Sequence, residues 1–375
     1  MIRAGVDHAQ LLSDFFRVVW DPASTPETVV AARLAAATAN PHGRGREIPT
    51  FLFLIGDRAV GHLTTIPARL WDGTQLVDAH HLKGLMVLPE HRNGPIGFLL
   101  VKAAVAELGP LLSMVVQSAP RRLFAHFGFH DLGAVPNWLR LLAPGRVAAR
   151  VDLEALGLRA IPTSLHRPFA LAQQTGLARV GGAVAGGAIS LWTGMRGGHG
   201  LVTATLAPGA LPAGEIDVLW LNAGADIAAA GNPRDGAYLD WRYRDGGEAT
   251  YQCVTARRDG QLVGLAVVRQ PRSESDGRLR GLRIATLADM LVHPDDAEAT
   301  LATLDAAECC ARALDADALL ATASHGSLEP LLRRRAYLKL PGNVHCMIRG
   351  GPDALSRALP EWWLFRGDGD ADEVF

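Results

Sequence analysis

The sequence has almost no net charge and few cysteines, and both shortages exclude classes of protein. Its 37 basic residues are matched by 38 acidic ones, which leaves a formal charge of −1. No global field attracts nucleic acid or an anionic membrane, so we expect no nucleic-acid partner. None of the cysteines, Cys253, Cys309, Cys310 and Cys346, stands in a C-x-x-C pair that could frame zinc or a redox disulfide. We therefore expect no metal site and a reducing, cytoplasmic environment.

Long apolar runs are also scarce. The N-terminal residues lack the uninterrupted apolar core of a secretory signal, so we expect no export. One stretch near the length of a membrane span, 176–195, contains a single charged residue, Arg179, and six glycines. The glycines make this stretch weakly hydrophobic. We expect an apolar linker helix packed against the domains and no membrane contact, although a helix that enters or docks on a membrane is the alternative.

What the sequence does contain is enough length and apolar content for more than one domain. Its 375 residues are 49% hydrophobic, which is ample for buried cores. The first forty residues have the spacing of two helices, with a capping box at Asp7-x-x-Gln10 before the first and a first-turn proline at Thr25-Pro26 in the second. Apolar runs then alternate with the turn signals Gly56-Asp57 and Asp72-Gly73, which predict two β-hairpins.

The order of these signals returns in the second half of the chain. A buried strand is predicted to end at Val87-Leu88-Pro89, and another ends at Val292-His293-Pro294; an apolar helix, a strand and a short helix follow each of them. Pro89 lies 40 residues before Phe129, and Pro294 lies 43 residues before Tyr337. Shared distances across five elements favour an internal duplication.

We therefore predict an α/β protein of the α+β type, made of two tandem domains, each with a mixed central sheet flanked by helices. The boundaries that we expect are 1–148 for the first domain, 149–212 for a helical or irregular connector, 213–352 for the second domain and 353–375 for a C-terminal tail.

One loop in the first copy carries the pattern most closely tied to chemistry. Residues 82–100 read LKGLMVLPEHRNGPIGFLL, and residues 122–129 read RLFAHFGF. This arrangement resembles the signature of the GNAT (GCN5-related N-acetyltransferase) superfamily. In that family a strand ends in V-x-P, R-x-x-G-x-G and a helix follow, and a short helix downstream ends in Gly-Phe. The resemblance covers most of residues 1–145.

The resemblance implies a site for acetyl-CoA or another acyl-CoA, the donor substrate of the family. Small residues let the backbone approach a diphosphate, and the amides at the start of the next helix present the positive end of its dipole. Arg92 adds a charge-assisted contact. The residues expected at the donor are Met86, Val87, Arg92, Asn93, Gly94, Ile96, Gly97 and Phe98. An ordinary tight turn between a strand and a helix is the other interpretation of this loop.

Two residues depart from the family pattern. Pro95 replaces the first glycine of R-x-x-G-x-G and has no N–H to donate to a phosphate. Phe124 stands where many relatives have a tyrosine that protonates the departing CoA thiolate, and phenylalanine cannot donate a proton. The resemblance thus supports acyl-CoA binding more than it supports a complete catalytic set.

Three histidines are candidates for the general base. His80 and His81 lie in the strand before V-x-P, which lines the acceptor side in this family, and strand neighbours point to opposite faces. His81 matches the position where many relatives carry a glutamate that takes the proton of the amine through water, and a histidine with a pKa near neutrality can do the same. His126 is a further candidate. A surface or hydrogen-bonded histidine without a catalytic role is the alternative interpretation.

The second copy has a different loop. Asp295-Asp296-Ala297-Glu298 follows its V-x-P and would repel a diphosphate, so we expect no acyl-CoA there. A nearby cluster of Trp241, Arg242 and Tyr243 could stack on a sugar or peptide acceptor, although aromatic residues near a helix end are also common in cores. We expect the acceptor to bind at the junction of the two domains.

These features predict an acyl-CoA-dependent N-acyltransferase, most simply an N-acetyltransferase, acting on an amine of a small molecule, sugar or peptide. A Fem-like aminoacyl transferase, which takes its donor from aminoacyl-tRNA, is an alternative against which the neutral charge and the lack of a basic tract weigh. A non-catalytic binding protein, in which both loops have decayed, is a second alternative, which Pro95 and Phe124 favour. The sequence leaves the oligomeric state open.

Overall fold

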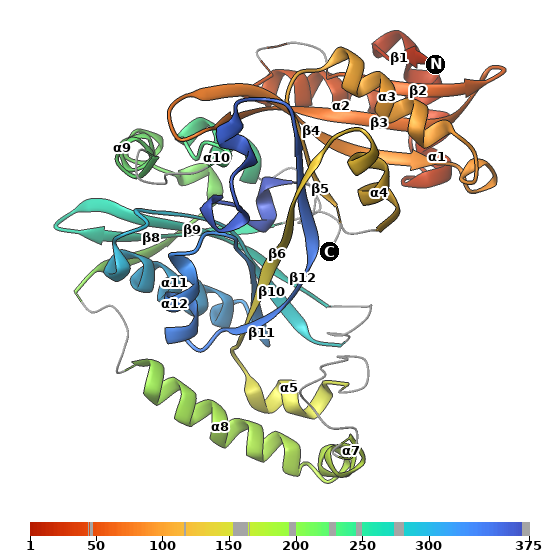
Figure 1. Cartoon of the computed structure of the whole chain (residues 1–375). Coiled ribbons are helices and arrows are strands. Elements are labelled where there is room, and N and C mark those ends of the chain that lie inside the picture. The colour runs from red at the N-terminus through yellow and green to blue at the C-terminus, as the bar shows by residue number, and fades with distance from the viewer. Residues whose placement is uncertain are drawn as a thin grey trace.

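One continuous sheet runs through both halves of the molecule (Figure 1). The computed structural model describes residues 1–43, 45, 48–115, 118–152, 164, 166–194, 200–224, 230–244, 250–273 and 281–369. In this part of the chain the sheet has 12 strands, and helices flank it. The predicted mixed α/β fold with two tandem copies is confirmed.

The first copy begins with a short strand and two helices and continues as a meander. The end of α1 leads to Thr25, whose side chain accepts a hydrogen bond from the Thr28 amide (3.3 Å) and so caps α2. The elements are β1 Ile2–Arg3, α1 Ala9–Val19, α2 Pro26–Ala39, β2 Thr50–Ile55, β3 Arg58–Trp71, β4 Leu76–Val87, α3 Ile96–Glu107, β5 Leu111–Val115, α4 Ser118–His126 and β6 His130–Leu141.

The second copy repeats this order element by element. Its elements are β7 Val202–Leu206, α9 Ala213–Gly224, α10 Gly236–Tyr243, β8 Tyr251–Arg258, β9 Gln261–Ser273, β10 Arg283–Val292, α11 Ala297–Ala313, β11 Ala318–Thr322, α12 Leu328–Arg334 and β12 Leu338–Arg349. The range 149–212 was predicted to be helical or irregular. Strand β7 lies within it, so that description of the connector is corrected. It pairs with β8 at the edge of the sheet, as β1 pairs with β2.

The strand order of the sheet is symmetrical. It runs β1-β2-β3-β4-β5-β12-β6-β11-β10-β9-β8-β7, which reads the same from either edge once each strand is matched to its counterpart in the other copy. The last strands have changed places. β12 pairs with β5 of the first copy, and β6 pairs with β11 of the second, while β6 and β12 pair with each other.

This exchange joins the copies at the centre of the molecule. Each copy receives its last neighbouring strand from the other, so the sheet is continuous across the two copies. The domain boundaries expected at 148 and 212 stay predictions. A buried ion cluster supports the junction: Glu308 of α11 accepts hydrogen bonds from Arg140 of β6 (3.2 Å) and from Arg335, just after α12 (2.9 Å).

Helices cover both faces of the first copy. Gly61 of β3 lies against Ile96 of α3, whereas the next residue, His62, lies against Phe15 and Phe16 of α1. Because neighbouring residues of a strand point to opposite faces, α3 and α1 pack on opposite sides of the sheet. The core between them is formed by residues such as Leu12, Leu63 and Leu100.

The connector forms a separate group of helices, α5 Pro144–Arg150, α7 His166–Gln174 and α8 Leu177–Gly194. In Figure 1, α8 runs beside α5, away from the sheet. It packs on a helix that begins within the range predicted for the first domain, and not on the sheet. Its contact with α5 is made by glycines: a Cβ on Gly182 would lie 2.6 Å from the Pro144 carbonyl oxygen. Its larger apolar side chains point outward, and Val184 is 71% exposed. Within the described residues, no helix is long and apolar enough to cross a membrane.

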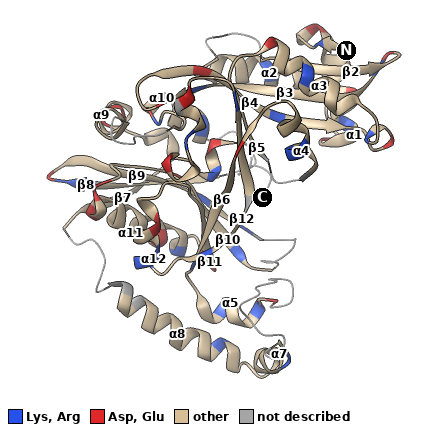
Figure 2. Ribbon diagram, viewed as in Figure 1, with Lys and Arg blue, Asp and Glu red and all other residues tan. Residues whose placement is uncertain are grey.

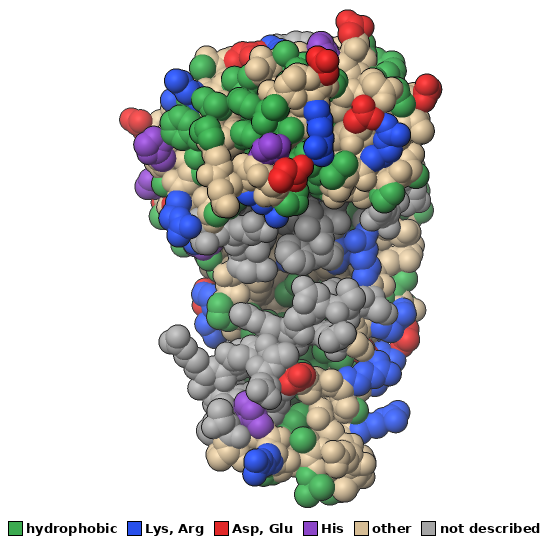
Figure 3. Space-filling view, turned by 90° about the vertical axis from the view of Figure 1, so that its right-hand side faces the viewer, with side chains coloured by type: hydrophobic (Ala, Val, Ile, Leu, Met, Phe, Trp, Pro, Cys, Tyr) green, Lys and Arg blue, Asp and Glu red, His purple; other side chains and the backbone are tan. Residues whose placement is uncertain are grey.

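Charges of both signs are interspersed over the two halves of the ribbon (Figure 2). The face in Figure 3 likewise shows hydrophobic, acidic, basic and histidine side chains close together in its upper part, which belongs to the first copy.

Candidate active site

The donor side of the candidate site is the gap where β4 and β5 separate. These strands pair in parallel at His80–Leu111 and His81–Leu112, and β5 then continues beside β12. From residue 82 to 87, β4 pairs with β3 on one edge, and among the described residues no strand pairs with its other edge. Backbone groups on such an edge can hydrogen-bond an extended ligand that carries amides.

The loop after β4 turns directly into α3. The amides of Arg92 and Gly94 donate to carbonyl groups of the loop itself, at 3.4 and 3.1 Å. Pro95 stands at the N-cap of α3 and has no N–H. The amides that remain to face an anion are those of Asn93 and of the first helical turn, because the first N–H groups of a helix have no carbonyl partner within it.

The Arg92 side chain is exposed and lies over the end of β4. Its Nε donates to the Val87 carbonyl oxygen (3.0 Å). This contact holds the guanidinium group beside the gap, where its other N–H groups can meet a phosphate. All eight residues predicted at the donor therefore lie along the end of β4, the loop and the start of α3.

A β-bulge interrupts β4 three residues before its end. His62 of β3 is opposite Met86, and Thr64 is opposite Lys83. An interval of two residues on β3 therefore faces an interval of three residues on β4, which has one extra residue. Gly84 adopts a left-handed conformation there, with φ of 62°. A Cβ at this position would also lie 3.3 Å from the ring of His62. The backbone angle favours glycine, and a side chain would also press on the ring.

On the α1 side of the sheet, the bulge borders a cavity of about 760 Å³. Helices α1 and α2 form one wall of this cavity, and β3 and β4 form the other, through His62, Thr64 and Gly84 among others. Its apolar lining includes Phe16, Trp20 and Val29. A cavity of this volume can enclose a molecule of several hundred daltons.

His62 is one of the residues that line this cavity. Its side chain is almost fully buried, and its Nδ1 is 2.8 Å from the Gly84 carbonyl oxygen. The ring stacks on Phe15 and meets Trp20 edge to face, with centroids 5.7 and 5.2 Å apart. Burial lowers the pKa of His62 to about 4, an effect that the hydrogen bond to Gly84 opposes and the charge of Arg33 reinforces. The imidazole is therefore neutral at pH 7.

Neither a family model nor a curated protein matches the sequence, but solved structures match the fold. A GCN5-related N-acetyltransferase from Anabaena variabilis aligns with a TM-score of 0.55 and 11% identity over 92% of this chain and 71% of its own. A probable N-acyltransferase from Enterococcus faecalis aligns with a TM-score of 0.58 and 11% identity over 93% of this chain and 71% of its own. The chain has the GCN5-related N-acetyltransferase fold. N-myristoyltransferase of Saccharomyces cerevisiae, solved with bound myristoyl-CoA, is also similar, with a TM-score of 0.50 and 11% identity over 78% of this chain and 67% of its own.

Within this acetyltransferase fold, the three predicted histidines lie in different places. His81 is buried, and its Nε2 is 3.2 Å from Oδ1 of Asn232, outside the cavity lining. His80 points to the opposite face, into a smaller cavity of about 340 Å³ near the end of α3. His126 is exposed at the end of α4, with its ring 5.4 Å from that of Phe98. The structure does not bring the three together.

The predicted acceptor residues are also separated. Trp241 and Arg242 of α10 line the cavity, so the second copy contributes one side of it. The Arg242 guanidinium also donates to the carbonyl groups of Gly367 (2.8 Å) and Gly369 (2.7 Å), which fixes its position. Tyr243 is fully buried and donates to Asp289 (2.9 Å), so the structure places this residue in the core and not at the cavity.

The second copy has carboxylates at the start of α11, where the first copy has the loop between β4 and α3. Asp296 caps α11 by accepting a hydrogen bond from the Ala299 amide (2.9 Å), and it pairs with Arg258 (2.7 Å). Glu298 pairs with the same arginine (2.7 Å). The first-turn amides of α11 therefore face a carboxylate of the chain itself, which would repel a diphosphate.

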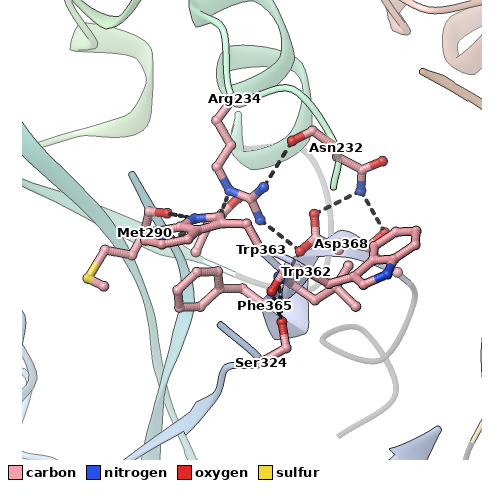
Figure 4. Close-up of polar contacts among 12 residues, drawn as sticks. Asn232, Arg234, Met290, Ser324, Trp362, Trp363, Phe365 and Asp368 are labelled. Carbon is pink, nitrogen blue, oxygen red and sulfur yellow. Dashed lines mark hydrogen bonds and ion pairs between the residues drawn. The ribbon is translucent and has the colours of Figure 1, made fainter. Parts of the chain in front are cut away.

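The strand gap of the second copy is filled by the C-terminal segment 362–368 (Figure 4). Beyond the last residue of β10 that pairs with β11, Trp363 Nε1 donates to the Met290 carbonyl oxygen (2.8 Å). On the β11 side, the Leu364 amide donates to Ser324 Oγ (2.9 Å). Met290 stands two residues before Val292, as Leu85 of the free β4 edge stands two residues before Val87.

Buried charges hold this segment in place. Arg234, which is fully buried, pairs with Asp368 of the segment (2.7 Å) and with Asp289 of β10 (2.6 Å), as Figure 4 shows in part. Asn232 donates to Asp368 (2.8 Å) and also contacts His81 of the first copy. The segment therefore takes the place that a donor would need in this copy.

Sequence reasoning missed His62 and the bulge at Gly84. The sequence marks neither, because His62 lies inside a β-favouring run and the extra residue of a bulge leaves no signature other than a glycine. No group of three or more potential ligands among the described residues is arranged to hold a metal ion.

Proposed function

We propose that this protein is an acyl-CoA-dependent N-acyltransferase, with acetyl-CoA as the simplest donor and an amine of a small molecule, sugar or peptide as the acceptor. The observation that supports this proposal most is that the strand gap and the large cavity both border the bulged end of β4. A strand gap with an arginine-bearing loop lies on one side, and a cavity of about 760 Å³ lies on the other. The fold is shared with acyltransferases.

In this proposal the donor lies along the free edge of β4. The amides of Ile96, Gly97 and Phe98, together with Arg92, hold its diphosphate, and Met86 and Val87 flank its pantetheine arm. The acceptor occupies the cavity, in contact with Trp241 and Arg242. Its amine nitrogen attacks the thioester carbonyl carbon, a C–N bond forms, the C–S bond breaks, and CoA leaves as the thiolate.

Donor binding tests this proposal directly. Titration calorimetry of the full chain with acetyl-CoA and longer acyl-CoAs should show one site per chain, since the gap of the second copy is filled. Arg92→Ala should weaken binding about tenfold, because a hydrogen bond to a charged group is lost. Arg92→Lys keeps the charge and should lose less. Absence of binding by any acyl-CoA would refute the proposal, and two sites per chain would refute the assignment to the first copy.

Acyl transfer is the second test. Release of the CoA thiol from acetyl-CoA should accelerate when a panel of amines is added, and mass spectrometry should find the acyl group on nitrogen. If acyl-CoA binds but no amine is acylated, the chain is a binding protein of the acetyltransferase fold, and the transferase proposal fails.

A further inference from the structure

His62 is a nearly fully buried histidine with one ring nitrogen engaged. A carbonyl oxygen can only accept a hydrogen bond, so the nitrogen close to the Gly84 carbonyl, Nδ1, must carry the proton. The neutral ring then has its lone pair on Nε2. Among the described residues, the contact of Nδ1 with the Gly84 carbonyl is the one hydrogen bond of the His62 ring, and the residue lines the large cavity.

The surroundings of His62 fix the ring in this orientation. Phe15 stacks on it, and Phe16 and Trp20 meet it edge to face, with centroid distances of 5.2 to 5.7 Å. In a regular strand the Gly84 carbonyl would pair with the neighbouring strand. The bulge turns this carbonyl toward Nδ1 of His62 instead. The ring has a fixed orientation and an unused lone pair on Nε2, and the residue lines the cavity. It is therefore suited to accept a hydrogen bond from a ligand.

We propose that Nε2 of His62 is the proton acceptor for the amine substrate in the cavity. This inference rests on the proposed function. When the amine nitrogen bonds to the thioester carbon it becomes positively charged, and one of its protons passes to Nε2 as the C–S bond breaks. The products are the amide, the CoA thiolate and a protonated His62. The imidazolium then gives this proton to the thiolate or to water, which restores the neutral ring.

The charge state of the ring suits this role. Burial, reinforced by Arg33 of α2, keeps the ring neutral at pH 7, so the lone pair is available. Lys83 of β4 and Asp21, after α1, also line the cavity. A base with a low pKa is sufficient here, because the nitrogen of the addition intermediate is far more acidic than a free ammonium group.

The decisive variants are His62→Gln and Leu63→Val. Glutamine can still donate to the Gly84 carbonyl but cannot take a proton, so kcat/KM should fall by about 10²–10⁴-fold. The Kd for acetyl-CoA should stay unchanged, since His62 is not part of the donor loop. Leu63, the next residue of β3, is buried, points to the opposite face and does not line the cavity. Leu63→Val disturbs the packing of the same strand but leaves the surroundings of the imidazole in place, and its kcat/KM should stay within a few-fold of that of the parent.

Chemical rescue covers the possibility that a substitution disturbs folding. Added imidazole should restore part of the activity of His62→Ala and none of the activity of Arg92→Ala. The proposal is overturned if His62→Gln retains parental kcat/KM, or if His62→Ala folds and is not rescued while Leu63→Val loses as much activity. If the parent chain acylates no amine, the proposed function fails first; if it acylates amines and His62→Gln does so equally well, this inference alone fails.

Discussion

At the scale of single residues, Pro95 is the clearest departure from a phosphate-binding loop. It caps α3 with a φ of −80°, a conformation that glycine also adopts. Pro95→Gly therefore adds an N–H at the diphosphate without requiring the helix to move. One hydrogen bond to a charged group contributes about 1.5–3 kcal/mol, part of which the flexibility of glycine offsets, so acetyl-CoA should bind about tenfold more tightly. Calorimetry measures the change; an unchanged Kd would mean that the loop does not contact the donor.

The placement of the residues expected at the donor could be predicted from the sequence because they are contiguous. A strand end, a turn with small residues and a helix start form a local unit, and its geometry follows from backbone preferences. The acceptor side could not be predicted in this way. His81 shares the face of Met86 and His62, which is the face of the cavity, but it is buried against Asn232 of the second copy. Which histidine reaches the cavity therefore depends on contacts between distant parts of the chain, which a strand pattern does not indicate.

At the scale of elements, the exchanged strands need a stable junction, and Glu308 provides part of it. It is completely buried and accepts hydrogen bonds from Arg140 and Arg335, one on each side of the junction. Glu308→Ala leaves these buried guanidinium groups without that carboxylate. We expect a loss of about 3–5 kcal/mol in the free energy of unfolding.

Urea denaturation monitored by circular dichroism measures this loss. Glu329→Ala is the matched control, because Glu329 pairs with Arg333 and Lys339 at the surface, where ion pairs contribute little. A Glu308→Ala protein as stable as the Glu329→Ala protein would show that the cluster does not support the junction.

The sequence predicted most elements and their order, since each copy shows the same hairpin signals, V-x-P end and helix. It did not predict the exchange of β6 and β12. An apolar strand has the same residue pattern whichever neighbour it pairs with, so the choice of partner is decided by distant parts of the chain. Strand β7 was missed because its five residues are mostly exposed and lie in a range that otherwise resembles a connector.

At the scale of the whole molecule, the shared sheet predicts that the two copies unfold together. Removing either copy would take away a central strand from the other, and the core of each depends on that strand. Denaturation in guanidinium chloride should give one transition, with far-UV circular dichroism and tryptophan fluorescence coinciding. Two separate transitions would show that the copies are independently stable in spite of the exchanged strands.

The exchange of strands gives the copy without a phosphate loop a structural role. The acids before α11 lie outside the sheet, so this role does not depend on binding a phosphate. Deleting that copy is a different matter, because β12 lies between β5 and β6 and its loss would open the first copy beside the donor gap. The second half thus serves the first as an internal subunit that completes its sheet.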